Sequence, residues 1–416
     1  METNEKNLRI YPLYKMISWD LLFYYSIIYL FLVQEKGMSP AQVLLSEAFY
    51  PIFRFLLAVP LTIIITKLGR KKGLIIANFS VAISILFYIF AKGINEIIVG
   101  QFFCALGFAI KAIEETNVLY DSLPKNEKRA KEFSKIDGKS MSLYFYFDAI
   151  SAVLSGFLYV INRYLPLICC FVICVLSTIL SCRFVEIKNE NKTNSTRKYF
   201  KELKHFIKHM YKSKRLKYLM VFGGILSGIF SVLISLRSGI LENINMPEQY
   251  FGIIFGILAV ISGISARNQS RFHNKLKNKT LAILSVTVTL SLIIIGFIAK
   301  LNNISIIIII LLLYIIQSIM KGPFYTLIRK YLNNFTTTTS RDKISYIYNL
   351  LESLFRALIL LFSSFLLDIT DITNTTIIVG SVFTIIFITL LEKMRKTVGL
   401  KPENYKKSEI EFLELK

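Results

Sequence analysis

The chain carries a series of long apolar blocks separated by short polar segments, and this pattern restricts its fold more than any other feature. The blocks include LICCFVICVLSTILSC, LAILSVTVTLSLIIIGFIA and ISIIIIILLLYIIQSI. A helix needs about 20 mostly apolar residues to cross the hydrocarbon core of a bilayer. The blocks show no alternation of apolar and polar residues, which argues against the strands of a membrane barrel. The sequence therefore predicts an all-α integral membrane protein.

The lengths and spacing of the blocks predict twelve transmembrane helices in two halves of six. The expected spans are 14–34, 43–66, 73–92, 97–122, 141–161, 165–185, 217–241, 250–266, 280–299, 303–328, 344–367 and 375–392. The longest hydrophilic segment lies between the sixth and seventh spans. We therefore expect an N-terminal half (1–186), a cytoplasmic linker (187–216), a C-terminal half (217–394) and a cytoplasmic tail (395–416). Within the linker, basic and apolar residues at helical spacing indicate an amphipathic helix suited to an anionic membrane surface.

The net charge of +23 follows membrane topology rather than a nucleic-acid surface. If the N-terminus is cytoplasmic, 41 of the 50 Lys and Arg residues lie on the cytoplasmic side, and only four lie in outer loops. Lys and Arg accumulate in the cytoplasmic loops of membrane proteins. This distribution predicts a multi-pass protein of the inner (cytoplasmic) membrane with both termini in the cytoplasm and no nucleic-acid partner.

Enzymatic chemistry is not expected from the sequence. All five cysteines fall inside predicted spans, so no disulfide framework is implied. The sequence has no phosphate-binding loop, nucleophile–base pair or metal-ligand cluster. We therefore expect no enzyme activity, no metal and no cofactor.

The two halves of the chain resemble each other, and one loop resembles a known family. Basic turns follow the second span (KLGRKKG) and the eighth (RFHNKLKNK), a type of repeat found in secondary transporters. The stretch VPLTIIITKLGRKKGLII, Val59 to Ile76, resembles the loop between the second and third helices of the major facilitator superfamily. The segments VLYDSLPKNEKRAKEFSKIDG and QYFGIIFGILAVISGISA resemble a drug-exporter-like branch of bacterial origin.

The resemblance implies the twelve-helix fold of that superfamily, with helices one, four, seven and ten around a central cavity. An Asp of the family's loop is replaced by Thr66 in this chain, so the charge cluster of the loop is incomplete. The residues that remain are Lys67, Gly69, Arg70 and Lys71. They are expected to form a gating loop or, alternatively, only a positively charged anchor at the membrane surface.

The fourth span contains an unusual number of charges. Lys111, Glu114, Asn117 and Asp121 follow one another at three or four residues and predict one polar stripe, with Glu115 beside Glu114. A charge at the bilayer centre costs about 2.5–3.5 kcal/mol on the insertion scale, and a water-filled cavity lowers that cost. We expect Lys111 to pair with Glu114 or Glu115. Asp121, near the cytoplasmic exit, is expected to be structural or to take part in gating.

Polar residues in other spans complete the expected pathway for substrate and protons. They are Asp20 in the first span, Asp148 in the fifth, Arg237 in the seventh, and Tyr314, Gln317 and Lys321 in the tenth. Arg237 is expected either to attract an anionic group of the substrate or to pair with Glu242. Glu352 and Arg356 stand four residues apart in the eleventh span and predict a structural ion pair.

Two roles are open for the carboxylates of the fourth span. Glu114 or Glu115 could exchange a proton as the cavity opens to either side of the membrane, because burial and neighbouring cations shift the protonation of a carboxylate in opposite directions. Alternatively, they form a permanently ionised salt bridge that holds the helix in place.

These observations predict a secondary active transporter that moves a small amphipathic molecule by alternating access, with proton-coupled efflux as the first expectation. The alternatives are a proton-coupled uptake permease for a nutrient or peptide, and a dedicated exporter of a self-made peptide or antibiotic. A non-transporting membrane sensor is a more remote alternative. The expected partners are a small-molecule substrate, protons and the lipid bilayer, and the chain is expected to act as a monomer.

Overall fold

The structure is a computed structural model that describes residues 2–124, 129–186, 214–276, 279–301, 304–334 and 341–395. All regular secondary structure in these ranges is helical. Almost all of the predicted linker helix and of the C-terminal tail lies outside the described residues.

The described elements follow the predicted spans closely. The first group is α1 (Glu2–Ser18), α2 (Ile28–Leu30), the π-helical turn η1 (Phe31–Glu35), α3 (Pro40–Leu68), α4 (Arg70–Phe90), α5 (Ile94–Ser122), α6 (Arg129–Ile161) and α7 (Leu165–Cys182). The second group is α9 (Lys214–Asn243), α10 (Glu248–Arg267), α11 (Gln269–Leu276), α12 (Thr280–Ile298), α13 (Ile304–Asn334), α14 (Arg341–Ile369) and α15 (Ile372–Arg395). Within the described residues, 11 helices are long and apolar enough to cross a membrane, and they overlap the predicted spans two to twelve.

The first predicted span is interrupted, so the expectation of a continuous helix over 14–34 is wrong. α1 ends at Ser18, and residues 19–27 form bends and turns before α2 begins. Asp20 Oδ1 accepts hydrogen bonds from the Leu21 backbone N–H (2.8 Å) and the Tyr25 hydroxyl (2.7 Å). A short acidic side chain that binds nearby backbone N–H groups competes with helix formation. Phe23 in the same stretch has a φ of 61°, a left-handed conformation that is uncommon outside glycine.

The chain divides into two compact units, each described here by itself. The first comprises the described residues of Met1–Thr193 together with Met246–Ile257, and the second those of Asn194–Asn245 and Leu258–Lys416. The beginning of α10 is thus grouped with the first unit, whereas the predicted halves keep 217–394 together.

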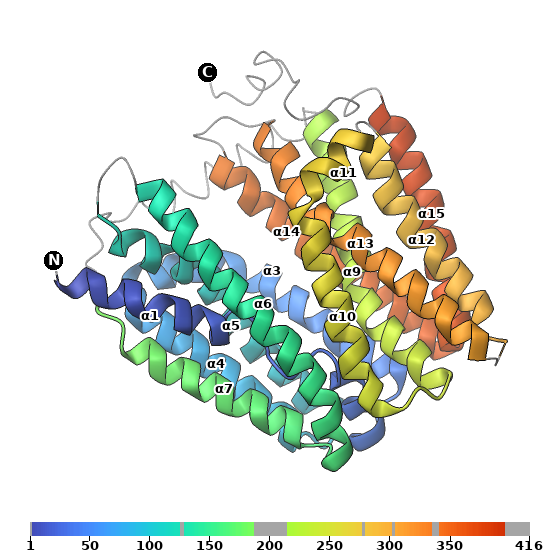
Figure 1. Cartoon of the computed structure of the whole chain (residues 1–416), viewed down its shortest axis with the longest axis horizontal. Coiled ribbons are helices and arrows are strands. Elements are labelled where there is room, and N and C mark those ends of the chain that lie inside the picture. Colours follow the sequence, from blue (N-terminus) through green and yellow to red (C-terminus); the bar gives the residue numbers. More distant parts are fainter. Residues whose placement is uncertain are drawn as a thin grey trace. The chain divides into compact units, whose positions relative to one another are not determined.

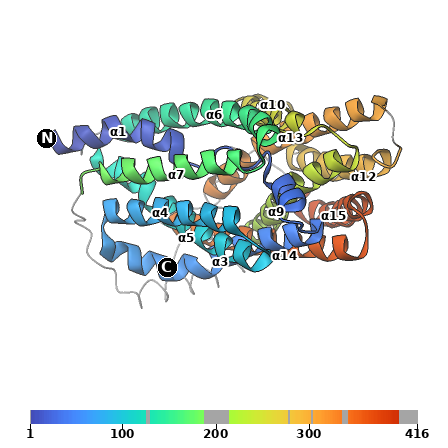
Figure 2. The ribbon, with the colours of Figure 1, turned by 90° about the horizontal axis from the view of Figure 1, so that it is seen from below.

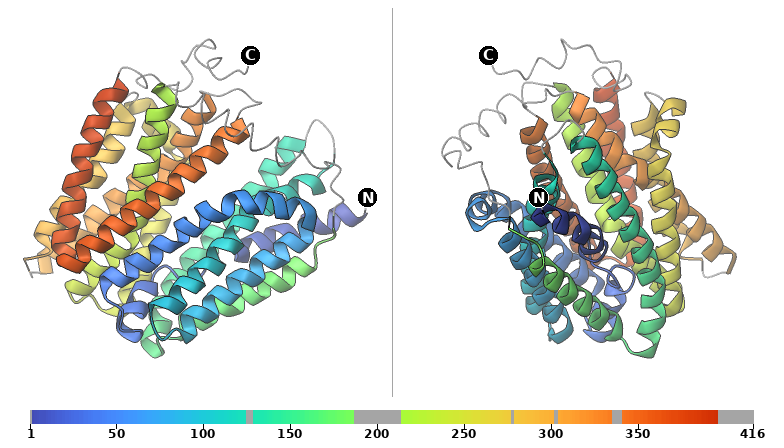
Figure 3. Two further views of the ribbon diagram at one scale, coloured as in Figure 1. Left: turned by 180° about the vertical axis from the view of Figure 1, so that it is seen from behind. Right: turned by 60° about the vertical axis from the view of Figure 1, so that its left-hand side comes forward.

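Each unit is a bundle of packed helices. In the first unit α4 packs along α5 and α7 (Figure 1), and α1 packs along α6 and α7 (Figure 2). In the second unit α12 packs along α15, and α9 packs along α14 (Figure 3).

Two glycines allow α4 and α5 to approach closely. A Cβ atom on Gly107 would lie 2.6 Å from the Ala77 carbonyl oxygen and 2.5 Å from Val81 Cγ2. A Cβ atom on Gly73 would lie 3.0 Å from Glu114 Cγ. Small residues at helix contacts in membranes let the backbones come together, where dispersion drives the association. This packing brings the first turns of α4 against the charged part of α5.

Asp371 caps the N-terminus of α15, just outside the spanning segment. Its Oδ1 accepts hydrogen bonds from the Asn374 backbone N–H (2.6 Å) and the Thr373 hydroxyl (2.7 Å). Although partial burial acts to raise the pKa of Asp371, the bonds from Asn374 and Thr373 and the charge of Lys300 hold this pKa below its usual value. A carboxyl whose folded-state pKa is depressed stabilises the protein above its unfolded-state pKa, and this contribution is lost as the pH falls through the folded-state pKa.

We expect Asp371→Ala to lower the unfolding free energy by about 1 kcal/mol, the usual effect of losing an N-cap. The melting temperature in detergent should fall at neutral pH, and the difference from wild type should shrink as the carboxyl is protonated in acid. Asp368→Ala is the matched control, because it removes an exposed acid three residues earlier. An equal loss in Asp368→Ala would contradict the capping role.

Candidate functional site

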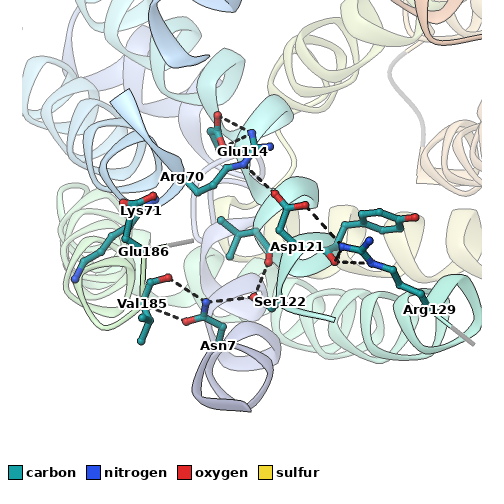
Figure 4. A network of polar contacts seen from close by, with 11 residues as sticks. Asn7, Arg70, Lys71, Glu114, Asp121, Ser122, Arg129, Val185 and Glu186 are labelled. Atoms are coloured by element: carbon teal, nitrogen blue, oxygen red, sulfur yellow. Dashed lines mark hydrogen bonds and ion pairs between the residues drawn. The ribbon is translucent and has the colours of Figure 1, made fainter. Parts of the chain in front are cut away.

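Arg70, the first residue of α4, connects two carboxylates of α5 (Figure 4). Its Nη1 lies 3.0 and 3.3 Å from the Glu114 carboxylate oxygens, and its Nε donates to Asp121 Oδ2 at 3.2 Å. Glu114 is only 1% exposed. Gly69, between α3 and α4, has a φ of 88°, which favours glycine, and a Cβ atom there would lie 2.9 Å from Glu186 Oε1. The turn therefore needs glycine in order to place Arg70 beside α5.

Arg129 extends the same polar network from the start of α6. Its guanidinium donates to the Tyr120 carbonyl oxygen at 2.6 and 3.1 Å, lies 3.9 Å from the centroid of the Tyr120 ring and lies 3.8 Å from Asp121 (Figure 4). Lys67, which was expected to belong to the gating loop, lies in the last turn of α3, and its side chain is outside the described part of the structure.

Asn7 joins α1 to the segment after α7. Its amide Nδ2 donates to Ser122 Oγ (3.2 Å) and to the Val185 carbonyl (3.1 Å), and its Oδ1 accepts from the Val185 N–H (2.8 Å). The Lys71 N–H donates to Glu186 Oε1 at 3.4 Å. Together with the contacts of Arg70, these bonds tie α1, α4, α5 and the end of α7 at one end of the first unit (Figure 4).

Lys111 and Glu115 both contact the interrupted end of α1. Lys111 Nζ donates to the Ser18 carbonyl oxygen at 2.6 Å, and Glu115 Oε1 accepts a 3.4 Å hydrogen bond from Ser18 Oγ. Both side chains are buried, with 4% and 3% of their surface exposed. The carbonyl of the last residue of a helix lacks an intrahelical donor. The ammonium of Lys111 supplies the missing donor inside the membrane.

The expected ion pair between Lys111 and Glu114 or Glu115 is therefore wrong. In the described residues no carboxylate lies within the 4.0 Å ion-pair distance of Lys111. The predicted single stripe is in fact two faces of α5: Glu114 and Asp121 contact Arg70, whereas Lys111 and Glu115 contact Ser18. Asn117 is half-buried and forms no hydrogen bond with the described residues.

A further charge pair, which the sequence pattern did not predict, joins the buried Lys15 of α1 to the half-buried Asp137 of α6. Lys15 Nζ contacts Asp137 Oδ1, and the Tyr11 hydroxyl donates to the same oxygen at 3.2 Å. Lys15 Nζ also lies 4.5 Å from the centroid of the Trp19 ring. Lys15 was counted with the basic residues of the cytoplasmic side, where charges are usually solvated. No spacing along the chain indicates this pair, because 122 residues separate Lys15 from Asp137.

Asp20 and Asp148 both lie in the first unit. Asp20 lies in the interruption between α1 and α2, and Asp148 lies on α6. Asp148 is half-buried and forms no hydrogen bond or ion pair with the described residues.

In the second unit, Arg237 of α9 donates through Nε to Gln317 Oε1 of α13 at 2.9 Å. It does not pair with Glu242, so that alternative is wrong. Tyr314 lies on the same face of α13, and its hydroxyl donates to the Arg237 carbonyl oxygen at 3.4 Å. Lys321, four residues after Gln317, is half-buried.

The Glu352–Arg356 pair of α14 is present, with Arg356 Nη1 3.9 Å from Glu352 Oε1. Ser227 of α9 donates to the same oxygen at 2.6 Å. This contact joins α14 to α9, a connection that the sequence spacing did not suggest.

Comparison with known proteins relates this arrangement to one family. The sequence profile described as Major Facilitator Superfamily matches residues 15–314. The uncharacterized MFS-type transporter YxaM of Bacillus subtilis (strain 168) is 22% identical over 269 residues, which is 63% of this chain and 66% of that protein. The aligned region thus spans just under two thirds of the relative's length.

Solved structures show the same fold. The nucleoside transporter NupG superposes with a TM-score of 0.74 at 11% identity, covering 98% of this chain and 100% of that one. A bacterial homolog of the human lysosomal transporter Spinster, inward-facing and occupied, gives a TM-score of 0.69 at 13% identity, covering 95% and 96%. The predicted fold class is thereby confirmed. At these identities the similarity concerns the fold alone.

Proposed function

The chain belongs to the major facilitator superfamily, a family of transporters and not of enzymes, and from this premise we propose that it exports a small amphipathic molecule across the cytoplasmic membrane in exchange for protons. The observation that supports proton coupling most strongly is Glu115. This carboxylate is 3% exposed in the spanning helix α5, and no cation in the described residues lies within ion-pair distance of it. A buried carboxylate without an ion pair is more readily neutralised by a proton than one held by a cation.

Glu115 is better suited to carry the proton than Glu114. Arg70 holds Glu114 through two short contacts, and an arginine stays protonated in proteins. Glu114 is thereby kept ionised, and we assign it to the gate with Asp121. Glu115 accepts a single long bond from Ser18 and interacts electrostatically with Lys15 and Lys111.

Protonation of Glu115 would act on the interrupted helix. Ser18 lies between Lys111 and Glu115, and it is the last residue of α1. A neutral Glu115 attracts Lys15 and Lys111 less strongly, because the Coulomb term with each cation is lost. The end of α1 and the adjoining Asp20 stretch are then free to shift, which couples the proton to the conformation of the first unit.

We expect Glu115→Gln to abolish compound-driven proton movement while leaving the protein folded. The neutral amide cannot exchange a proton but keeps the shape and the hydrogen-bond acceptor for Ser18. The measurement uses the full-length chain in proteoliposomes with a trapped pH indicator and a panel of amphipathic compounds, together with accumulation assays in both orientations of the membrane.

Glu114→Gln and Asp148→Asn are tested in parallel. Glu114→Gln is expected to lower stability more than coupling, and Asp148→Asn tests the half-buried carboxylate of α6. Wild-type proton flux in Glu115→Gln would refute the assignment of the proton site to Glu115, and loss of flux in Asp148→Asn alone would move that site to Asp148. Accumulation only in the inward direction would refute efflux, and compound movement independent of any pH gradient would refute proton coupling.

A further inference from the structure

Arg237 is a buried cation of the second unit. It lies in α9 and is 5% exposed. Besides the bond of its Nε to Gln317, its guanidinium carbon lies 5.3 Å from the centroid of the Tyr314 ring. Gln317 Nε2 donates in turn to Ser291 Oγ of α12 at 2.8 Å. Three helices of this unit thus contribute side chains around one guanidinium.

No anion in the described part of the chain neutralises this charge. No carboxylate of the described residues lies within 4.0 Å of the guanidinium, and Nη2 is buried without a hydrogen-bond partner. Buried polar groups are satisfied in the great majority of cases, so an orphan donor on a buried cation calls for an explanation. Ionisable groups inside membranes are costly and are usually paired or functional.

The contacts leave one nitrogen of the guanidinium, Nη2, without a hydrogen-bond partner among the described residues. Gln317 Oε1 accepts the hydrogen bond from Arg237 Nε, and Gln317 Nε2 donates to Ser291 Oγ. These two bonds fix the orientation of the amide, and its oxygen does not bond to Nη2. The unpartnered Nη2 belongs to the terminal edge of the guanidinium, which Nη1 and Nη2 form. That edge matches the two oxygens of a carboxylate or phosphate group, which arginine binds through two parallel hydrogen bonds. The ring of Tyr314 provides an apolar surface next to it.

We propose that Arg237 is the binding site for an anionic group, a carboxylate or a phosphate, of the transported molecule. The inference rests on the proposed transport function and narrows its substrate class to amphipathic organic anions. Gln317 is a positioning residue, since it fixes the plane of the guanidinium and reaches the ligand only through Arg237.

The test measures anion binding to the full-length protein purified in detergent. The probes are acetate, an alkyl carboxylate, inorganic phosphate and an alkyl phosphate, at constant ionic strength, with an alkylammonium and an uncharged alcohol as comparators. Carboxylate or phosphate probes are expected to raise the melting temperature of the wild type, and the alkylammonium and alcohol are not. Whichever of the four anions stabilises the protein identifies the group.

Arg237→Met should lower the affinity of the protein for that anion by roughly 10- to 100-fold, because hydrogen bonds to charged groups are stronger than those between neutral groups. Arg237→Lys should restore part of the binding, and Gln317→Leu should weaken it less than Arg237→Met. Arg356→Met is the matched control, because it removes an arginine of the same unit that is already paired with Glu352. The Arg356→Met protein should bind the anion with the affinity of the wild type.

Arg237→Met is itself expected to stay folded, because methionine is apolar and leaves no buried charge. Equal stabilisation of wild type and Arg237→Met by the anions would overturn the proposal, and so would the absence of any shift in the wild type. These outcomes concern binding alone. Failure of the proton-flux assay with intact anion binding would instead count against the transport mechanism.

Discussion

Replacing Arg70 with alanine is expected to destabilise the protein by about 3–5 kcal/mol, because it leaves the carboxylate of Glu114 buried without its cation. Glu114 is 1% exposed, and Arg70 is its ion-pair partner at 3.0 Å. Asp121 loses its 3.2 Å contact in the same step. The chain should show a large fall in its melting temperature in detergent and should lose transport in proteoliposomes.

Two further variants separate this ion pair from a general effect of positive charge. Lys72→Ala removes an exposed cation from the same turn and should leave stability within about 0.5 kcal/mol of wild type. The double variant Arg70→Gln with Glu114→Gln removes both charges and should recover much of the loss, because the unpaired buried carboxylate is gone. If Arg70→Ala were no less stable than Lys72→Ala, the proposed role of the pair would be wrong.

The second large effect is expected from Gly107→Val, which should prevent α4 and α5 from packing. The new Cβ atom would lie 2.6 Å from the Ala77 carbonyl oxygen, and a backbone atom cannot rotate out of the way. Overpacking of this kind costs about 1–3 kcal/mol and more where the backbone must move. The separation of the helices would also draw Arg70 away from Glu114, so transport should fall with stability.

Gly138→Ala provides the control for Gly107→Val. Gly138 lies within α6, and a Cβ atom there would have no heavy atom within 4 Å. Alanine is favoured over glycine in a helix by about 0.5–1 kcal/mol, so this variant should be neutral or slightly stabilised. Size-exclusion profiles and melting curves of both variants make the comparison. A monodisperse Gly107→Val of wild-type stability would contradict the packing argument.

The fold was largely predictable because lipid imposes a simple rule on sequence. A spanning helix must form all of its backbone hydrogen bonds internally, and it needs about 20 apolar residues to cross the lipid. Each span can therefore be recognised as an apolar block in the sequence. Spans two to twelve overlap described helices for this reason. The prediction of a continuous first span was wrong because a hydropathy pattern does not show side-chain hydrogen bonds. Asp20 accepts a hydrogen bond from the Leu21 N–H, and Lys111 donates one to the Ser18 carbonyl.

Candidate site residues were recognisable by type but not by partner. The charges of α5 stood out against an apolar background. Lys111 was expected to pair with Glu114 or Glu115, but the cation that binds Glu114 is Arg70, from another helix. Spacings of three or four residues identify neighbouring side chains on one helix, but they do not identify side chains on an adjacent helix. Lys15 and Asp137 were overlooked for the same reason, since 122 residues separate them along the chain.

The sequence by itself determined that this chain is a helical membrane protein with ionisable residues inside its spans. The length of each apolar block and the positions of the charged residues within it are given directly by the order of the amino acids. Only the tertiary structure decided which of those charges are neutralised by one another. Arg70 forms an ion pair with Glu114, and Lys111 donates a hydrogen bond to the last residue of α1. Arg237 contacts only neutral groups among the described residues. Electrostatic energy depends on distance and burial in three dimensions, and neither is contained in the order of the residues.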